Sequence, residues 1–165
     1  MAKESHQRAL DGIQQLEMRL SFRFAVLQRL MDRQMTRILS RHQLTLATYR
    51  ILITIKAFNE ISAANLVRLV VVDKGLVSRC CTEMQTAGLI HARQDPSNGR
   101  RKLLQLTAAG DAKLAAVEPE VDARNTSING QLEDNERDTL DRVLAKLTTH
   151  VAASLDDHAE LRLAT

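Results

Sequence analysis

One stretch near the middle of the chain constrains the fold most, because a helix, a glycine stop and a turn follow one another directly. Asp73 is a good N-cap for a helix that runs to about Ala87, and Gly88 stands where a helix ends. Two short strands are expected at about 89–94 and 102–106. The residues between them favour a turn: Pro96, Asn98 and Gly99. The stretch therefore predicts a helix followed by a β-hairpin.

The predicted helix has two different sides. Apolar residues at steps of three and four are expected to face the core: Val77, Cys80, Cys81 and Met84. The other side is polar and basic, and its members are Lys74, Gly75, Leu76, Ser78, Arg79 and Thr82. Such a helix fits the major groove of duplex DNA, where Arg79 can donate two hydrogen bonds to guanine and Leu76 can touch a thymine methyl. Gly75 permits close backbone approach, whereas Lys74 and Thr82 are expected at phosphates.

The hairpin tip is basic. Arg100, Arg101 and Lys102 follow Asn98, and residues 65–102 hold seven Lys or Arg against three Asp or Glu. An exposed arginine beside a turn suits the narrow, electronegative minor groove, so Asn98, Arg100 and Arg101 are predicted to contact DNA. The alternative interpretation is that the basic hairpin is merely solvated and that the helix is an ordinary surface helix, with no DNA contact by either.

The charge is unevenly distributed along the 165 residues. Residues 118–165 contain eleven acidic and five basic side chains, a net charge of −6, and since the whole chain carries +3, the first 117 residues carry +9. A basic body beside an acidic end fits a surface that binds a polyanion, although the acidic end can equally be a solvated helix. Aromatic residues make up only 2 %, so the core must be aliphatic.

Long apolar faces mark both ends of the chain. Over residues 10–40 the apolar positions recur at steps of three and four: Ile13, Leu16, Leu20, Phe24, Leu27, Met31, Met35 and Ile38. A final helix from about Asp134 has a similar face: Leu140, Leu144, Leu147, Val151 and Leu155. One small lobe cannot cover both faces, so we expect them to pack against a second subunit. A basic stripe on the first helix, either solvated or anion-binding, comprises Arg29, Arg33, Arg37 and Arg41.

Hydroxyl residues predict where the other helices begin. Thr45 caps a helix that runs to about Phe58, Ser62 caps a short helix to about Val70, and Thr107 caps a long helix. Pro119 can bend that long helix, and residues 125–130 are its expected break.

The chain resembles the MarR family of winged-helix transcriptional regulators. The resemblance is specific over about residues 40–118. It rests on these segments: Leu44-Thr45, Ser62 to Val67, Asp73 to Arg79, Gly88-Leu89-Ile90, Asp95 to Arg100 and Leu106 to Gly110. The family's wing signature is Asp-x-Arg, and here it reads Asn98-Gly99-Arg100, with an amide in place of the acid.

The resemblance implies a mainly α fold with a small β-hairpin wing, in which a winged helix-turn-helix stands between dimerisation helices. The expected units are 1–42 for the N-terminal dimerisation helix, 43–110 for the DNA-binding domain and 111–165 for the C-terminal dimerisation helices. It also implies a homodimer in which each lobe reads half of a palindrome, with Ser62 and Asn65 at the DNA backbone. A pocket between the dimerisation helices and the DNA-binding lobe would take a small aromatic or anionic effector, and its candidate lining residues are Arg41, His42 and Tyr49.

Three functions can be weighed. The leading one is a dimeric DNA-binding regulator of transcription, a repressor released by a small molecule. A winged-helix module for protein–protein contact is the alternative, but such a module has no need of Arg79 and Arg100 facing outward together. An enzyme is not expected, because no paired acid and base or nucleophile cluster occurs.

Metal and membrane chemistry are not expected either. The five histidines are scattered, with no His-x-x-x-His or Cys-x-x-Cys pair, so we predict neither metal nor cofactor. Cys80 and Cys81 are adjacent and expected to be structural, reduced thiols, which favours a cytoplasmic protein. No apolar run is long enough for a membrane span.

Overall fold

The computed structural model describes residues 12–154 except 14 and 71, and only the backbone of residues 99 and 100. Its helices are α2 (Leu20–Arg41), α3 (Leu46–Phe58), α4 (Ala63–Leu69), α5 (Lys74–Thr86), α6 (Ala108–Asn129) and α7 (Asp134–Ser154). Its strands are β1 (Ile61–Ser62), β2 (Ile90–Asp95) and β3 (Asn98–Leu106). The predicted class, mainly α with a small β wing, is confirmed.

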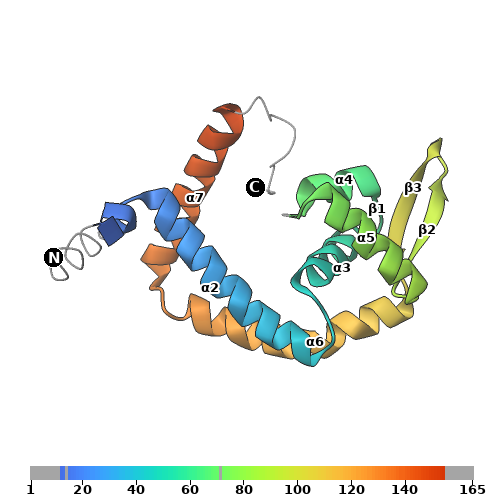
Figure 1. Ribbon diagram of the computed structural model, residues 1–165, viewed down its shortest axis with the longest axis horizontal. Helices are drawn as coiled ribbons and strands as arrows, with labels where there is room; N and C mark the ends of the chain where they lie inside the picture. Colours follow the sequence, from blue (N-terminus) through green and yellow to red (C-terminus); the bar gives the residue numbers. More distant parts are fainter. Residues whose placement is uncertain (1–11, 14, 71, 155–165) are drawn as a thin grey trace, which may run out of the picture.

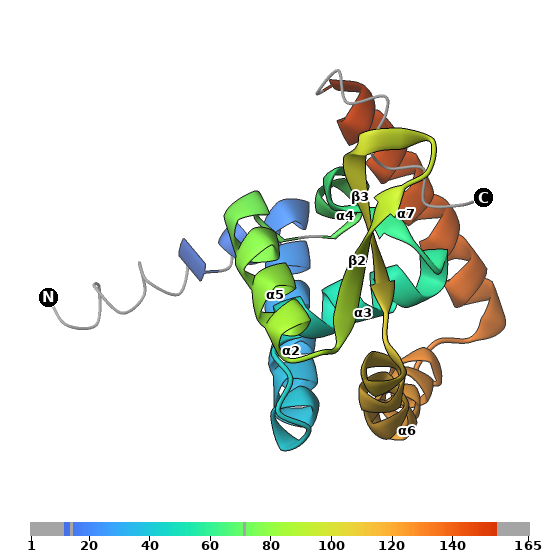
Figure 2. The ribbon, with the colours of Figure 1, turned by 90° about the vertical axis from the view of Figure 1, so that its right-hand side faces the viewer.

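The elements form a lobe and an arm (Figure 1). The lobe contains α3, α4, α5 and the strands, and α6 runs from beneath it to lie alongside α2 in the arm. Helix α7 leaves the far end of α6 and points away from it. Seen from the side, the β2–β3 hairpin stands at the edge of the lobe, with α5 on one side and α4 behind it (Figure 2). None of the helices in the described residues is long and apolar enough to cross a membrane.

Each predicted N-cap is confirmed as a hydrogen bond. Thr45 accepts from the Thr48 N–H at 3.0 Å, Ser62 accepts from Asn65 N–H at 3.2 Å, and Thr107 accepts from Gly110 N–H at 3.1 Å. Asp73 accepts from the N–H groups of Gly75 and Leu76, at 2.8 and 3.1 Å. These bonds satisfy helix N–H groups that have no partner inside the helix, so each helix begins where a side-chain acceptor precedes it.

Gly88 ends α5 as predicted. Its φ of +68° lies in the left-handed region, which glycine adopts without steric cost, and the chain turns there from α5 into β2.

The wing is a three-stranded sheet rather than the predicted two-stranded hairpin. The strand order is β1-β3-β2, with Ile61 paired to Leu104 and Ile90 paired to Leu106, both antiparallel. Strand β3 also begins at Asn98, earlier than the expected 102. The two residues of β1 are too few to show a strand pattern, so only pairing with β3 defines the strand.

The core is aliphatic, as the composition predicts, and lies mainly where α3 meets α5, α6 and the sheet. Its largest fully buried side chains are Leu39, Ile51, Leu52, Ile55, Leu66, Ile90, Val77 and Val117. This core fixes α3, which supports α5 from behind.

One expectation about the long helices was wrong. The first helix is not continuous over 10–40, because the chain turns at Met18 and Arg19 is extended before α2 begins. Helix α6 contains Pro119 and ends at Asn129, so Gly130 after it lies at the end of the expected break, 125–130. Arg124, which donates to the carbonyl of Met31 at 3.2 Å, ties this part of α6 to α2. Periodicity alone does not reveal such packing.

Candidate nucleic-acid interface

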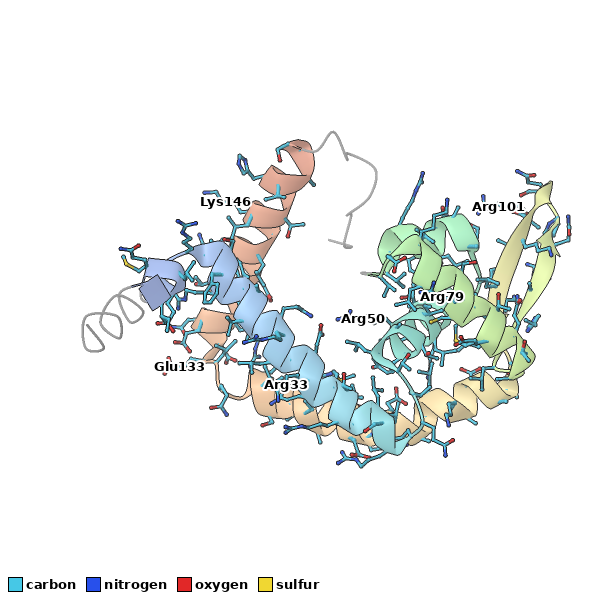
Figure 3. The ribbon with its side chains drawn as sticks, viewed as in Figure 1. Arg33, Arg50, Arg79, Arg101, Glu133 and Lys146 are labelled. Atoms are coloured by element: carbon cyan, nitrogen blue, oxygen red, sulfur yellow. The ribbon has the colours of Figure 1, made fainter. Side chains whose placement is uncertain are left out.

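Helix α5 presents its polar side outward. Val77, Cys80 and Met84 are buried against the core, as predicted. The predicted DNA-contacting side is exposed at five of its six positions: Lys74, Gly75, Ser78, Arg79 and Thr82. In Figure 3, Arg79 is labelled on α5 and Arg101 on the nearby wing, so two basic groups from different elements belong to one lobe.

Two members of this set have partners within the lobe. Leu76 is half-buried and packs against the core, which limits the side-chain surface it can offer to a thymine methyl. The Thr82 hydroxyl donates to the Ser78 carbonyl at 3.1 Å, a bond within the helix. The assignment of this side of α5 to DNA contacts therefore depends mainly on Arg79, Lys74 and Ser78, and it stays a prediction.

Helix α4 supplies a different surface from the one expected. Ser62 is 3 % exposed and its hydroxyl caps α4, so the geometry does not support the predicted DNA-backbone contact by this side chain. Asn65 is exposed and keeps its predicted place. Arg68, three residues further on and also exposed, was missed by the sequence analysis. Because Arg68 follows Asn65 by three residues, both lie on one side of α4. This spacing, visible in the sequence, could have identified Arg68.

The wing turn is braced by Asp95. Its Oδ1 accepts from the Ser97 N–H at 2.9 Å and from the Ser97 hydroxyl at 2.7 Å, while Oδ2 lies 3.4 Å from Arg101 Nε. The hydrogen bonds from Ser97, followed by the charge of Arg101, hold the pKa of Asp95 below its ordinary value. The acid missing at Asn98 is thus replaced by one three residues earlier, and it engages Arg101.

The strands of the hairpin determine where the other wing residues lie. Asn98 is exposed and its residue pairs with Asp95 across the hairpin. Arg100 lies in β3, but its side chain is outside the described part of the chain. At the base of the hairpin, Arg93 and Gln105 both donate to Glu60, with Arg93 Nε and Gln105 Nε2 each 3.0 Å from the carboxylate oxygen. This contact fixes the hairpin to the loop before β1.

The three predicted pocket residues do not line one pocket. Arg41 and His42, at the end of α2, both pair with Glu120 on α6, and His42 Nε2 lies 2.8 Å from Glu120 Oε1. Neither lines the hollows beside Tyr49. A carboxylate distant in sequence engages Arg41 and His42, and their grouping with Tyr49 at an effector pocket stays a prediction.

Tyr49 itself lies between two hollows at the junction of α2, α3 and α6. One, of about 220 Å³, is also lined by Arg50 and Arg124, and the other measures about 190 Å³. Arg124 Nε is buried and has no hydrogen-bond partner, the single such side-chain atom within the described residues. Burial, followed by the charge of Asp122, raises the pKa of Tyr49, so its hydroxyl keeps its proton as a donor.

In the described residues, the cysteines and titratable side chains form neither a metal-binding group nor a reactive thiol site. No group of three or more His, Cys, Asp or Glu that could hold a metal ion occurs there. Cys80 and Cys81 are free thiols. Burial raises the pKa of both, that of Cys81 to about 11, which is the opposite of what a reactive thiolate requires.

Comparison with known proteins agrees with this arrangement. The model of the MarR family matches residues 44–102, which span α3 to the wing. Over these residues the chain is similar to the MarR family. An HTH-type transcriptional regulator of Bacillus cereus is 29 % identical over 113 residues, covering 68 % of this chain and 75 % of the relative.

Solved MarR family structures share the fold. A mutant of MarR from E. coli complexed with operator DNA superposes with a TM-score of 0.70 at 23 % identity, over 78 % of this chain and 92 % of that one. BpsR of Bordetella bronchiseptica, whose DNA binding is regulated by 6-hydroxynicotinic acid, gives a TM-score of 0.61 at 22 % identity, over 76 % and 98 %.

Proposed function

We propose that this protein is a dimeric, sequence-specific DNA-binding regulator of transcription, and a repressor released by a small molecule. The observation that carries the proposal is the exposed N-terminal half of α5, with Arg79 on its surface, in the same lobe as a wing that bears Arg101. The match of residues 44–102 to the MarR family model and the similarity to an HTH-type transcriptional regulator support the same function. No enzymatic activity is proposed.

The lobe can engage duplex DNA through both grooves. Helix α5 enters the major groove by its N-terminal half, where Arg79 donates to a guanine edge and Lys74 reaches a phosphate. The wing arginines, Arg100 and Arg101, approach the minor groove. Asn65 and Arg68 on α4 lie at the flanking backbone, where they add affinity and fix the register. A location in the cytoplasm, with access to DNA, completes this part of the proposal.

Dimerisation is supported by apolar surface that one chain leaves uncovered. Leu20, Phe24 and Leu27 on α2 are 51, 38 and 54 % exposed, and none of the described residues of α7 is buried. Burying such surface is worth roughly 25 cal/mol per Å², so two chains would bury it against each other. We propose residues 1–42 and 111–165 as the dimerisation units and 43–110 as the DNA-binding unit.

A charge placed on this surface tests the dimer. Leu27→Glu should give a monomeric or poorly folded product by light scattering, because the carboxylate cannot be buried without a partner. Gln34→Glu, at an exposed position of the same helix, is the matched control and should remain dimeric. A folded wild-type monomer at micromolar concentration would contradict the proposal.

The effector site is proposed at the hollow beside Tyr49. Arg124 Nε and the Tyr49 hydroxyl can both donate to an anion, and the rest of the lining includes the apolar Met31, Met35 and Val121. Arg50 is held by Asp32 at 2.8 Å, so the rim joins α2 to α3. A small aromatic or anionic effector here would alter how the arm holds α3, and α3 supports α5. Binding would thereby change the spacing of two recognition helices in the dimer.

Selection of bound sequences from random duplex DNA tests the function. We expect a near-palindrome with half-sites about one helical turn, roughly 10 base pairs, apart, and an affinity that falls steeply with salt. Absence of enrichment at moderate salt would favour the alternative, a winged-helix module for protein–protein contact.

A further inference from the structure

The dipeptide Asn-Gly occurs twice in the chain, at Asn98-Gly99 in the wing and at Asn129-Gly130 at the end of α6. Both asparagines are exposed. Asparagine is a thermally labile residue, and it is most reactive before glycine, which has no side chain to keep its backbone nitrogen away from the asparagine amide. The structure places the two copies in different surroundings, and these surroundings determine which copy can react.

The copy in α6 is held in a helical conformation. Asn129 is the last residue of the helix, and Gly130 follows it with a φ of −71° and a ψ of −4°. The N–H of Gly130 donates to the Thr126 carbonyl at 2.9 Å, so its nitrogen is engaged in the last turn. To reach the Asn129 side chain, this nitrogen would have to leave both the hydrogen bond and the helical backbone angles. Reaction at Asn129 therefore requires the end of α6 to unwind first.

The copy in the wing lies where β3 leaves its regular pairing with β2. Gln94 pairs with Lys102 and Asp95 pairs with Asn98, so residues 99–101 of β3 have no partner residue among the described strands. In a bulge of this kind the extra residues lie outside the ladder of paired residues. Gly99 begins the bulge, and its backbone can therefore rotate toward the Asn98 side chain without separating a strand pair.

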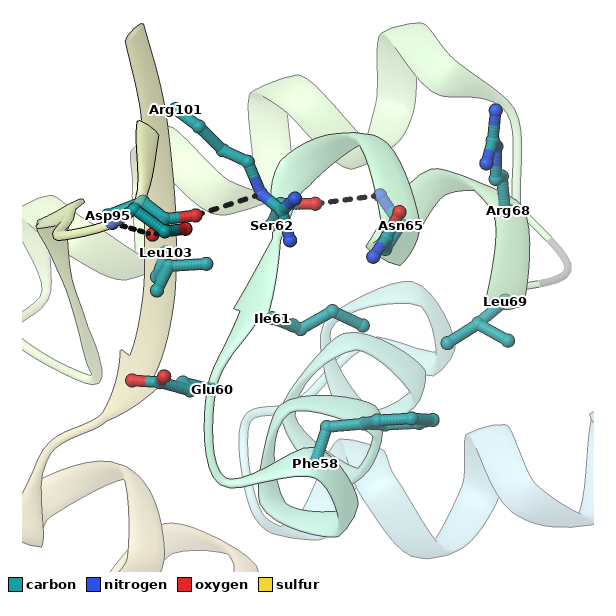
Figure 4. A pocket seen from close by; sticks show the side chains of 11 residues that line it. Phe58, Glu60, Ile61, Ser62, Asn65, Arg68, Leu69, Asp95, Arg101 and Leu103 are labelled. Carbon is teal, nitrogen blue, oxygen red and sulfur yellow. Dashed lines mark hydrogen bonds and ion pairs between the residues drawn. The ribbon is translucent and has the colours of Figure 1, made fainter. Parts of the chain in front are cut away.

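The wing is anchored on both sides of this dipeptide. Before it, the turn is held by the two hydrogen bonds from Ser97 to Asp95. After it, Arg101 Nε lies 3.4 Å from the other oxygen of the same carboxylate (Figure 4). Asn98 and Gly99 stand between these two anchors. The wing can therefore keep its turn while the Gly99 backbone rotates.

We propose that Asn98 is a site of spontaneous deamidation, and that this modification controls the wing. The Gly99 nitrogen attacks Cγ of Asn98 and forms an N–Cγ bond. The bond from Cγ to the side-chain nitrogen breaks, and this nitrogen leaves as ammonia with the proton that Gly99 has lost. Water then opens the five-membered imide at one of its two carbonyls, and no oxidant or reductant takes part. Opening at Cγ gives aspartate, whereas opening at the main-chain carbonyl gives isoaspartate, whose main chain runs through Cβ and Cγ.

The two products would affect DNA binding differently, and this consequence rests on the proposed function. Aspartate at position 98 supplies the acid of the Asp-x-Arg wing signature, two residues before Arg100. Isoaspartate instead adds one carbon to the main chain directly before the bulge that carries Arg100 and Arg101, so it displaces both side chains from the minor groove. Because neither product returns to asparagine, the wing would lose DNA affinity as the protein ages.

Mass spectrometry of aged full-length protein without DNA tests the site. After incubation at 37 °C and pH 8.5, the tryptic peptide 94–100 should gain the mass of an amide-to-acid conversion, while Asn129 in peptide 125–137 stays unmodified. Gly99→Ala should slow the reaction about tenfold, because a Cβ hinders the approach of the backbone nitrogen. Asn98→Gln should abolish it.

Unfolding in urea is the control for the role of structure. Both asparagines should then react at similar rates, since neither the helix nor the bulge persists. An unmodified Asn98, or equal modification of Asn98 and Asn129 in the folded protein, would overturn the proposal.

DNA binding of the separated products tests the consequence. The isoaspartyl fraction, identified with an isoaspartyl methyltransferase, should bind the selected duplex about tenfold more weakly than unaged protein, because its wing arginines are displaced. Asn98→Asp, which has the same charge and a normal main chain, should stay within about twofold of unaged protein. Aged Asn98→Gln should keep its affinity.

Two outcomes separate this inference from the proposed function. An isoaspartyl fraction that binds like unaged protein would overturn the control of the wing by deamidation. Failure of unaged protein to bind any duplex would contradict the proposed function, and it would leave the mass-spectrometric result at Asn98 unchanged.

Discussion

His42 Nε2 lies 2.8 Å from Glu120 Oε1 and joins the end of α2 to the middle of α6. Arg41 pairs with the same carboxylate, so two consecutive residues hold the arm together just before the chain enters the lobe. The hydrogen bond from His42, followed by that from Arg41, lowers the pKa of Glu120 below its ordinary value.

This contact predicts an acid-sensitive contribution to stability. Since the pKa of Glu120 is lower in the folded state, its contribution is present above the unfolded-state pKa, about 4.3, and is lost as the pH falls through the folded-state value. Glu120→Gln should therefore be less stable than wild type at pH 7, with the difference shrinking in acid. Urea unfolding between pH 3 and 7 measures this. Parallel pH profiles would show that Glu120 contributes nothing through its charge.

Loss of Arg79 and loss of Arg100 should affect DNA binding in different ways. Arg79→Ala removes a proposed base contact, so it should cost about 1–3 kcal/mol and relax preference at one position in each half-site. Arg100→Ala should weaken binding and reduce the preference for narrow, A/T-rich flanks. Competition against single-base variants of the selected site distinguishes the two. Equal losses on every sequence would mean that both side chains contact phosphates only.

Arg124 should control the response to an effector rather than DNA binding. Arg124→Lys keeps the positive charge but removes the buried Nε donor, so the effector concentration for half-release of DNA should rise about tenfold or more. Fluorescence anisotropy of labelled DNA, with 6-hydroxynicotinate and benzoate as probes, provides the measurement. Arg137→Lys, at an exposed ion pair with Asp134, is the control. An unaltered response in Arg124→Lys would place the effector elsewhere.

The cysteines should resist alkylation in the folded protein. With the pKa of Cys81 at about 11, its thiolate fraction at pH 7.5 is roughly 300-fold below that of a free thiol. Labelling by iodoacetamide, followed by mass spectrometry, should accelerate about tenfold per pH unit up to pH 10, because only the thiolate reacts. Urea-unfolded protein provides the reference rate. Rapid labelling of folded protein at pH 7.5 would instead indicate a redox-capable thiol.

Local signals in the sequence were sufficient for most helices of the lobe. Thr45, Ser62, Asp73 and Thr107 each cap a helix through N–H groups two or three residues away, and Gly88 ends α5 by its own backbone freedom. The buried side of α5 likewise followed from the spacing of its apolar residues. Such features depend on neighbours within one or two turns of chain, so the sequence alone determines them.

Tertiary structure determined the features that join distant residues. The pairing of β1 with β3, the contact of Arg41 and His42 with Glu120, and the buried Nε of Arg124 all link segments far apart in the chain. The brace of Arg101 by Asp95 is short in sequence, yet it depends on where the bulge at Gln94 and Asp95 falls in the hairpin. A side chain can have several compatible partners along a sequence, and only the packed fold determines which one lies within bonding distance.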